Sequence, residues 1–160
     1  ISNDWEGYHR EIADTEEHLY TESDGKIIGE HNGAHFYTIG QRKGLNIGGY
    51  VNPIFIIQTN TLTNTVYVGE HESHPGLSRK GLLIQEQDIH WVADRDKMKV
   101  GDSREYDLRI RYRQPLFRAT LTKQEDGMSV VFQTPKKAVA KGQFAAWYDG
   151  EVLVGSGVIS

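Results

Sequence analysis

The last third of the chain alternates between short strand-like runs and turn residues. Five runs combine apolar and polar residues at a period near two: 105–113, 116–123, 128–133, 143–148 and 151–159. The segments between them carry turn residues: Gln114-Pro115, Glu125-Asp126-Gly127, 135–142 and Asp149-Gly150. Five or six short strands at this spacing favour a small closed β-barrel, because closure leaves no exposed sheet edge.

A second, smaller β region precedes the barrel. Residues 53–58 are nearly all apolar, and the turn at 60–64 predicts a hairpin with a strand at 65–68. Shorter strands are predicted at 26–29 and 34–39. The sequence therefore predicts a mainly β protein, with a central β module followed by a C-terminal β-barrel.

Charge and composition divide the chain into three parts. Residues 1–25 hold eight acids and one base, whereas the remaining 135 residues carry seventeen bases and fourteen acids. We expect an acidic connecting segment at 1–23, the central β module at 24–82 and the barrel at 83–160. Only residues 26–160, which are mildly basic, suggest a polyanionic partner.

Several classes of protein are excluded by composition. Cysteine is absent, which removes disulfides, thiolate zinc sites and cysteine nucleophiles. No apolar run approaches the roughly 18 residues that span a bilayer, and the first residues lack the charged-then-apolar order of a signal segment. The expectation is a cytoplasmic protein with no membrane partner.

A basic triplet between two glycines stands out in the central module. Arg42 and Lys43 follow Gln41 and lie between Gly40 and Gly44. Glycine allows a close backbone approach, so this turn is a candidate contact for an anion or nucleic acid. A tight turn with two solvated cations fits the same residues. It is not a nucleotide-binding P-loop, because no Gly-Lys-Ser/Thr follows a four-residue spacer.

The histidines raise the question of a metal site. His31 and His35 lie four residues apart, and His71 and His74 lie three apart. On a strand, a spacing of four separates side chains by roughly 13 Å, so only folded loops would bring them to one ion. A small metal-dependent hydrolase is therefore the least favoured alternative, and no metal site is expected. Nothing in the spacing of serines or carboxylates marks a nucleophile-base pair, so no catalytic residue is predicted.

The strongest charge feature lies at 109–124, with five bases and no acid. On a strand, Arg109, Arg111 and Arg113 would share one face, opposite Ile110 and Tyr112. Three guanidiniums in a row could bind the phosphates of a nucleic acid, and a tyrosine beside them could stack on a base or ribose. A solvated barrel face is the competing interpretation. A second basic loop at 136–143 would lie near the first if the barrel closes.

These residues, taken together, resemble the tRNA-specific 2-thiouridylase family. Residues 29–49 match its GEH, TIGQRKGL and IGG motifs, and His90-Trp91 and 111–114 match an HW pair and an RYRQ motif. The family's closing motif is matched from Pro135 to Ile159, with Lys141 in place of the usual proline. The match extends from about residue 24 to residue 160.

The resemblance implies both a function and a missing part. The family's amino-terminal ATP-pyrophosphatase domain, with its SGG-DS phosphate loop and two catalytic cysteines, has no counterpart here. This chain resembles the central and C-terminal modules, the latter similar to a barrel domain of elongation factor Tu. The whole enzyme is expected to thiolate C2 of the anticodon wobble uridine, using ATP with magnesium and sulfur from a persulfide donor. The fragment is expected to hold tRNA, to bind no cofactor and to be inactive alone.

The resemblance also implies which residues contact tRNA. The positions that match the family's tRNA contacts in the barrel are Arg111, Tyr112 and Gln143. Adjacent strand residues face opposite ways, so Arg111 and Tyr112 contact RNA together only at a strand end or edge. Charge adds four secondary candidates for tRNA binding: Arg42, Lys43, Arg109 and Arg113. The alternative function is a free-standing RNA-binding or translation-associated β-barrel.

Overall fold

The structure is a computed structural model, and it describes residues 19–160. The predicted acidic segment therefore lies almost wholly outside the described residues. The chain divides into two compact units, which we call the central unit (residues 19–78 of those described) and the barrel unit (79–160). The division falls four residues before the predicted boundary, which lies inside a continuous strand, β3 (Ser78–Trp91).

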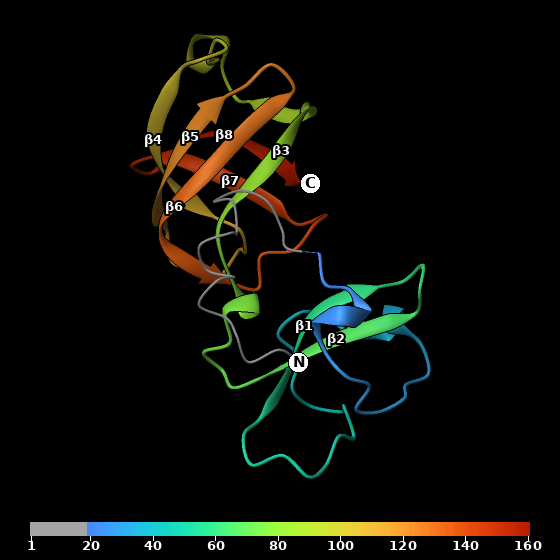
Figure 1. Ribbon diagram of the computed structural model, residues 1–160. Coiled ribbons are helices and arrows are strands. Elements are labelled where there is room, and N and C mark those ends of the chain that lie inside the picture. The colour runs from blue at the N-terminus through green and yellow to red at the C-terminus, as the bar shows by residue number, and fades with distance from the viewer. Residues whose placement is uncertain (1–18) are drawn as a thin grey trace. The chain divides into compact units, whose positions relative to one another are not determined.

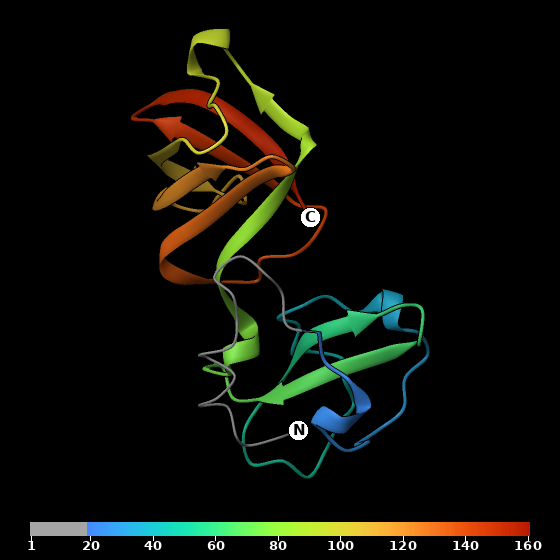
Figure 2. The ribbon, with the colours of Figure 1, turned by 45° about the horizontal axis from the view of Figure 1, so that its top comes forward.

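The central unit contains one antiparallel hairpin (Figure 1). Strand β1 (Ile54–Asn60) pairs with β2 (Thr65–Glu70), as the sequence predicts. Asn60 closes the turn, because its Oδ1 accepts hydrogen bonds from the backbone N–H groups of Leu62 at 3.0 Å and Thr63 at 3.1 Å. Figure 2 shows the two strands side by side.

The two shorter strands predicted upstream are absent from the described central unit. Residues 26–29 and 34–39 form irregular loop, with a 3₁₀ helix at Ala34–Phe36. The Gly33 N–H donates to Nδ1 of His31 at 3.1 Å, and the Ala34 N–H donates to Oδ1 of Asn64 at 2.8 Å. Side-chain acceptors bind the backbone N–H groups of Gly33 and Ala34 here, which is why the predicted strand at 34–39 does not form.

The core of the central unit is split between two small clusters. One contains Tyr20, Ile57 and Leu77, and the other contains Ile54, Ile56 and Val68. Ile56 and Ile57 are consecutive on β1, so their side chains face opposite sides of the hairpin and lie in different clusters. The ring of Tyr20 stacks on Tyr67 at 5.7 Å between centroids.

The barrel unit is a closed barrel with strand order β3-β6-β5-β4-β7-β8 (Figures 1 and 2). Its remaining strands are β4 (Ser103–Arg109), β5 (Phe117–Lys123), β6 (Gly127–Lys137), β7 (Phe144–Asp149) and β8 (Val152–Ile159). The other short 3₁₀ helices are Glu22–Asp24, Pro75–Leu77 and Asp94–Asp96. The predicted mainly β fold with a closed barrel is confirmed.

The barrel interior is filled by apolar side chains, with Trp147 fully buried among them. Along β5, Ala119 and Leu121 point inward and are fully buried, while Arg118 and Thr120 lie on the outer face. This is the alternation that the sequence shows. Because the buried cluster is apolar, the polar and charged side chains considered below lie on the outer surface and at the ends of the barrel.

Two sets of loops close the barrel at opposite ends. Residues 110–116 connect β4 to β5, and residues 138–143 connect β6 to β7 at the same end, since Leu108 pairs with Phe117 and Arg109 pairs with Ala146. The β3–β4 loop (92–102) and the β5–β6 and β7–β8 turns lie at the other end. Figure 1 shows the β3–β4 loop above the labelled strands.

Candidate nucleic-acid interface

The loop after β4 holds most of the sequence-predicted contact residues. The strand ends at Arg109, so Arg111, Tyr112 and Arg113 lie in a turn and not on one strand face. Gln114 closes this turn, because its Oε1 accepts from the Ile110 N–H at 3.1 Å and its own N–H donates to the Arg111 carbonyl at 3.0 Å. The prediction of a strand over 105–113 was therefore wrong for its last four residues.

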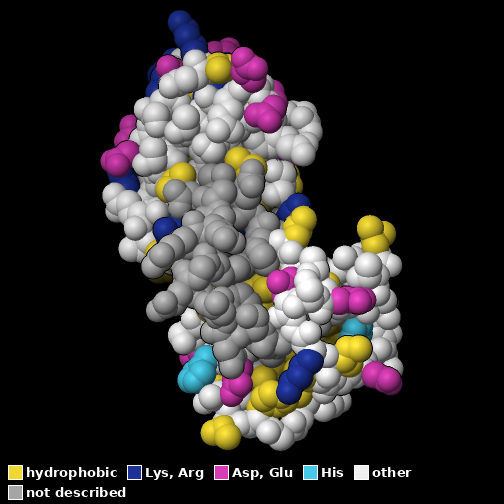
Figure 3. All heavy atoms as spheres, viewed as in Figure 1, with side chains coloured by type: hydrophobic (Ala, Val, Ile, Leu, Met, Phe, Trp, Pro, Cys, Tyr) yellow, Lys and Arg dark blue, Asp and Glu magenta, His cyan; other side chains and the backbone are white. Residues whose placement is uncertain are grey.

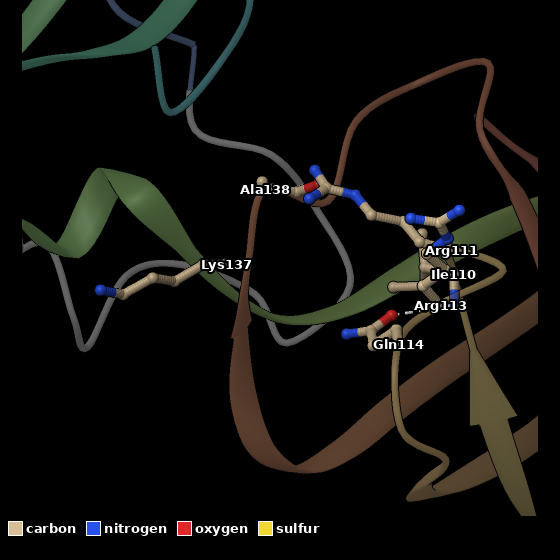
Figure 4. Close-up of a pocket in the computed structure, with 6 residues that line it drawn as sticks. All are labelled: Ile110, Arg111, Arg113, Gln114, Lys137 and Ala138. Carbon is tan, nitrogen blue, oxygen red and sulfur yellow. Dashed lines mark hydrogen bonds between the residues drawn. The ribbon is translucent and has the colours of Figure 1, made fainter. Parts of the chain in front are cut away.

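Arg111 links the two loops at this end of the barrel. One of its terminal nitrogens, Nη2, donates a hydrogen bond to the Ala138 carbonyl oxygen at 3.0 Å (Figure 4). Ala138 has a φ of 56°, in the left-handed region. A guanidinium has five N–H donors, so this bond fixes the side chain while leaving most of its donors for a ligand.

A shallow hollow of about 290 Å³ lies beside this contact (Figure 4). Its walls come from both loops and from the end of β6: Ile110, Arg111, Arg113, Gln114, Lys137 and Ala138. Three of these six residues carry positive charge, and none is acidic. The volume is at the lower limit for ligand pockets and suits a phosphate or one edge of a nucleotide better than a whole cofactor.

Gln143 lies at the base of the second loop. Its Oε1 accepts from the Ala140 N–H at 3.1 Å, and its backbone carbonyl accepts from the Ile159 N–H at 2.8 Å. Gly142 precedes it with a φ of 80°, which forms the turn. Because the side-chain oxygen is engaged in the loop, the amide NH₂ is the group suited to contact RNA. The structure places Gln143 at the same barrel end as Arg111, but outside the hollow.

Tyr112 is 88% exposed at the tip of the first loop. Its ring is available to a ligand, whereas its carbonyl oxygen accepts from Nη1 of Arg109 at 3.1 Å. The guanidinium of Arg109 also lies 5.2 Å from the ring centroid of Tyr148. Arg109 is therefore committed to contacts within the protein, and it holds the turn that presents Tyr112.

The two ends of the barrel differ in charge. Residues 109–117 and 136–143 contain six lysines and arginines and no aspartate or glutamate, and we call this the basic end. The opposite end, residues 92–102, 124–126 and 149–151, contains seven acids and three bases. Figure 3 shows acidic side chains over that opposite end. Some are paired there: Lys97 lies 2.7 Å from Asp94, and this hydrogen bond lowers the pKa of the Asp94 carboxyl.

The basic turn of the central unit is held by β1. The Gly40 N–H donates to the Ile56 carbonyl at 2.7 Å, and the Ile56 N–H donates to the Gln41 carbonyl at 3.0 Å. Arg42 and Lys43 project from this turn and are exposed. The Gly40 and Gln41 amides are used within the protein, so the exposed groups that the turn offers an anion include the side chains of Arg42 and Lys43.

Two of the described histidines have local structural roles. His31 Nδ1 accepts from the Gly33 N–H, and His74 Nδ1 accepts from the Gly76 N–H, both at 3.1 Å. Within residues 19–160, no three histidine or acidic side chains lie close enough together to hold a metal ion. The same residues include no helix that is long and apolar enough to cross a membrane.

Comparison with known proteins assigns both units. Residues 8–70 match the family model described as "tRNA methyl transferase PRC-barrel domain", and residues 80–159 match "Aminomethyltransferase beta-barrel domain". The curated protein tRNA-specific 2-thiouridylase MnmA of Flavobacterium johnsoniae is 52% identical over 136 residues, which cover 85% of this chain and 34% of the relative. Proteins with the same name from Christiangramia forsetii and Chlamydia trachomatis serovar L2 are 46% and 37% identical, over 88% and 92% of this chain. The chain belongs to the tRNA-specific 2-thiouridylase family.

Within this family the chain corresponds to the middle and C-terminal domains. It spans 34% to 40% of the length of the 2-thiouridylases named above. The resemblance drawn from the GQRKGL and RYRQ motifs is confirmed. Arg42 and Lys43 lie in the segment that matches the middle domain, whereas Arg111, Tyr112 and Gln143 lie in the segment that matches the barrel domain.

The proximity of the two basic loops was predictable from the sequence, whereas the hydrogen bonds that hold them were not. The basic loop at 136–143 does lie beside the arginine-rich loop, as expected from closure of the barrel. The roles of Gln114 as a turn-closing acceptor and of the Ala138 carbonyl as a partner for Arg111 were missed. The Gln-Pro pair at 114–115 was the available signal, since proline commonly terminates a strand.

Proposed function

We propose that this chain is the tRNA-holding part of an ATP-dependent tRNA-uridine 2-sulfurtransferase. The whole enzyme thiolates C2 of the anticodon wobble uridine with sulfur from a persulfide donor in the cytoplasm. The chain contains no cysteine, so it does not itself carry a persulfide. Its part in the reaction is to bind and orient tRNA, and it is inactive without the remainder of the enzyme.

The observation that carries the proposal is the basic end of the barrel. Six cationic side chains gather there without an acidic neighbour in the same segments. The Arg111 guanidinium is held by the Ala138 carbonyl, so less side-chain entropy is lost when it contacts a phosphate. An exposed tyrosine stands next to it, and amide donors from Gln143 lie at the same end. Phosphate-binding cations beside an aromatic ring and an amide form the combination that RNA recognition uses.

ATP and magnesium belong, in this proposal, to the part of the enzyme outside this chain. The described residues do not fit them: no acidic cluster holds a metal, and the Gly40 amide is not free to bind phosphate. We derive no ATP-dependent step from these residues. Their contribution to the chemistry is positional, since correct placement of the substrate lowers the entropic part of the activation barrier.

The test is a titration of unmodified tRNA transcript into the 160-residue chain at several salt concentrations. We expect weak binding at low salt, with log Kd rising linearly with log salt at a slope of about 3, as for three to four phosphate contacts. A DNA duplex of similar length is the control for non-specific polyanion binding. Failure to bind tRNA, or equal affinity for the DNA duplex, would contradict the proposal.

A further inference from the structure

An aromatic side chain at the start of β7 has no structural explanation in the barrel core. Phe144 is 65% exposed, whereas the next residue, Ala145, is fully buried. The alternation along β7 therefore directs Phe144 to the outer face. A phenylalanine in this position adds no core packing and leaves a large apolar ring in water.

The position of Phe144 is defined by the strand register. It follows Gln143 directly, and across the sheet it pairs with Val158 of β8. On the other side, the pairing of β4 with β7 ends at Arg109 and Ala146, two residues before Phe144, and β4 ends at the same Arg109. Phe144 therefore begins its strand at the basic end of the barrel, directly after Gln143, where the loop that carries Arg111 and Tyr112 leaves β4.

Exposed aromatic rings in the barrel unit occur at this end. Residues 79–160, all described, contain eight phenylalanines, tyrosines and tryptophans, of which Tyr112 and Phe144 are the exposed ones. The exposed large apolar residues near the acidic end are aliphatic: Val92, Val100, Val152 and Leu153. Two aromatic rings and six cations therefore share one end of the barrel.

We propose that Phe144 and Tyr112 are stacking platforms at the basic end of the barrel, and that they bind bases of an unpaired RNA segment. Bases in loops and ends are free to stack on aromatic side chains, while the phosphates between them pair with arginine and lysine. The inference rests on the proposed tRNA-binding function and adds a substrate feature to it, namely unpaired nucleotides. An apolar protein partner fits this surface less well, because covering it would take several cations out of water.

The test compares matched variants of the 160-residue chain. Phe144→Ala removes the ring, Phe144→Trp keeps a stacking surface, and Val152→Ala is the control. Val152 is 64% exposed, on the same barrel but next to the acidic turn at 149–151. The probes are unmodified tRNA transcript, and a single-stranded RNA of about ten nucleotides containing 2-aminopurine, whose fluorescence is quenched when it stacks.

We expect Phe144→Ala to weaken binding of both RNAs about tenfold and to reduce the quenching of 2-aminopurine. The salt dependence should be unchanged, because an uncharged ring releases no counterions. Phe144→Trp should retain affinity and quenching, and Val152→Ala should behave as the wild type. An RNA duplex without unpaired nucleotides should bind both Phe144 variants equally.

The outcomes separate this inference from the proposed function. If the wild type binds tRNA but Phe144→Ala matches Val152→Ala in affinity and quenching, the stacking role is overturned and tRNA binding stands. If the wild type binds neither RNA, both are overturned. If Phe144→Ala leaves RNA binding intact but dissociates a dimer seen by light scattering, the ring contacts protein and the inference is overturned.

Discussion

The Arg111 guanidinium donates a hydrogen bond to the Ala138 carbonyl oxygen across 27 residues of sequence. This contact ties the β4–β5 loop to the β6–β7 loop, and it combines two basic segments into one surface. A closed barrel makes it possible, because β4 and β7 are hydrogen-bonded neighbours although β5 and β6 lie between them in sequence. This basic surface is therefore a property of the barrel and not of either loop alone.

Arg111→Ala should weaken tRNA binding by several-fold and lower the salt slope by about one, because one phosphate contact is lost. Arg111→Lys should keep the slope but bind less tightly, since an ammonium lacks the planar fork that contacts a carbonyl and a phosphate together. Filter binding at four salt concentrations measures both quantities.

The control for Arg111 is Arg95→Ala. The Arg95 side chain is 85% exposed at the opposite end of the barrel. Its replacement by alanine removes the same single positive charge as Arg111→Ala does. If the Arg95 variant lowers the slope as much as the Arg111 variant, binding reflects net charge and the basic end has no special role.

Gln143 allows its structural and binding roles to be separated. Gln143→Ala removes the acceptor for the Ala140 N–H, so it should cost about 1 kcal/mol of stability as well as weakening tRNA binding. Gln143→Glu keeps an acceptor oxygen but loses the NH₂ donors and adds a negative charge. We expect the Glu variant to melt like the wild type and to bind tRNA more weakly than the Ala variant. Wild-type tRNA affinity in Gln143→Glu would show that the amide does not contact RNA.

The barrel was predictable because each of its strands buries one face. Along β5, for example, buried Ala119 and Leu121 alternate with the outward-facing Arg118, and a two-residue period of this kind is visible in the sequence. The order of the strands was not predictable in the same way. Pairing of β4 with β7 depends on contacts between residues far apart, and no local pattern encodes it.

The strand predictions at 110–113 and 34–39 were wrong because side chains there compete for backbone hydrogen bonds. Gln114 captures the Ile110 N–H, and Asn64 captures the Ala34 N–H, so neither segment continues as a strand. The identities of the candidate contact residues came from the family resemblance and from charge. Their arrangement depended on these turns, because a straight strand would have placed Arg111 and Tyr112 on opposite faces.

The GQRKGL turn should be sensitive to backbone strain at Gly44. Gly44 has a φ of 80°, and an added Cβ would meet nothing closer than 3.9 Å, so Gly44→Ala tests conformation without a clash. We expect a loss of about 1 kcal/mol in the free energy of unfolding. Gly48→Ala is the matched control, since Gly48 lies in open space without a positive φ and should be neutral or slightly stabilising. Equal urea midpoints for the two variants would contradict the assigned turn.

Gly127 should be the least replaceable glycine of the barrel. A Cβ at this position would lie only 2.1 Å from the backbone carbonyl oxygen of Ile84, which no side-chain rotation relieves. Gly127 begins β6, which neighbours β3 in the closed barrel, so a methyl group would force these strands apart. We expect Gly127→Ala to cost about 3 kcal/mol and to lower the melting temperature of the barrel by more than about 10 °C.

The measurement is thermal unfolding followed by tryptophan fluorescence in a Trp5→Phe background, because Trp91 and Trp147 both lie in the barrel. Asp126→Ala is the control: it alters an exposed neighbour while keeping the backbone carbonyl that accepts from the Glu86 N–H. The tRNA affinity of Gly127→Ala below its melting transition should equal that of the wild type, because the β5–β6 turn lies at the end opposite Arg111. A melting temperature within 2 °C of the wild type would show that β3 and β6 do not approach as closely as the structure places them.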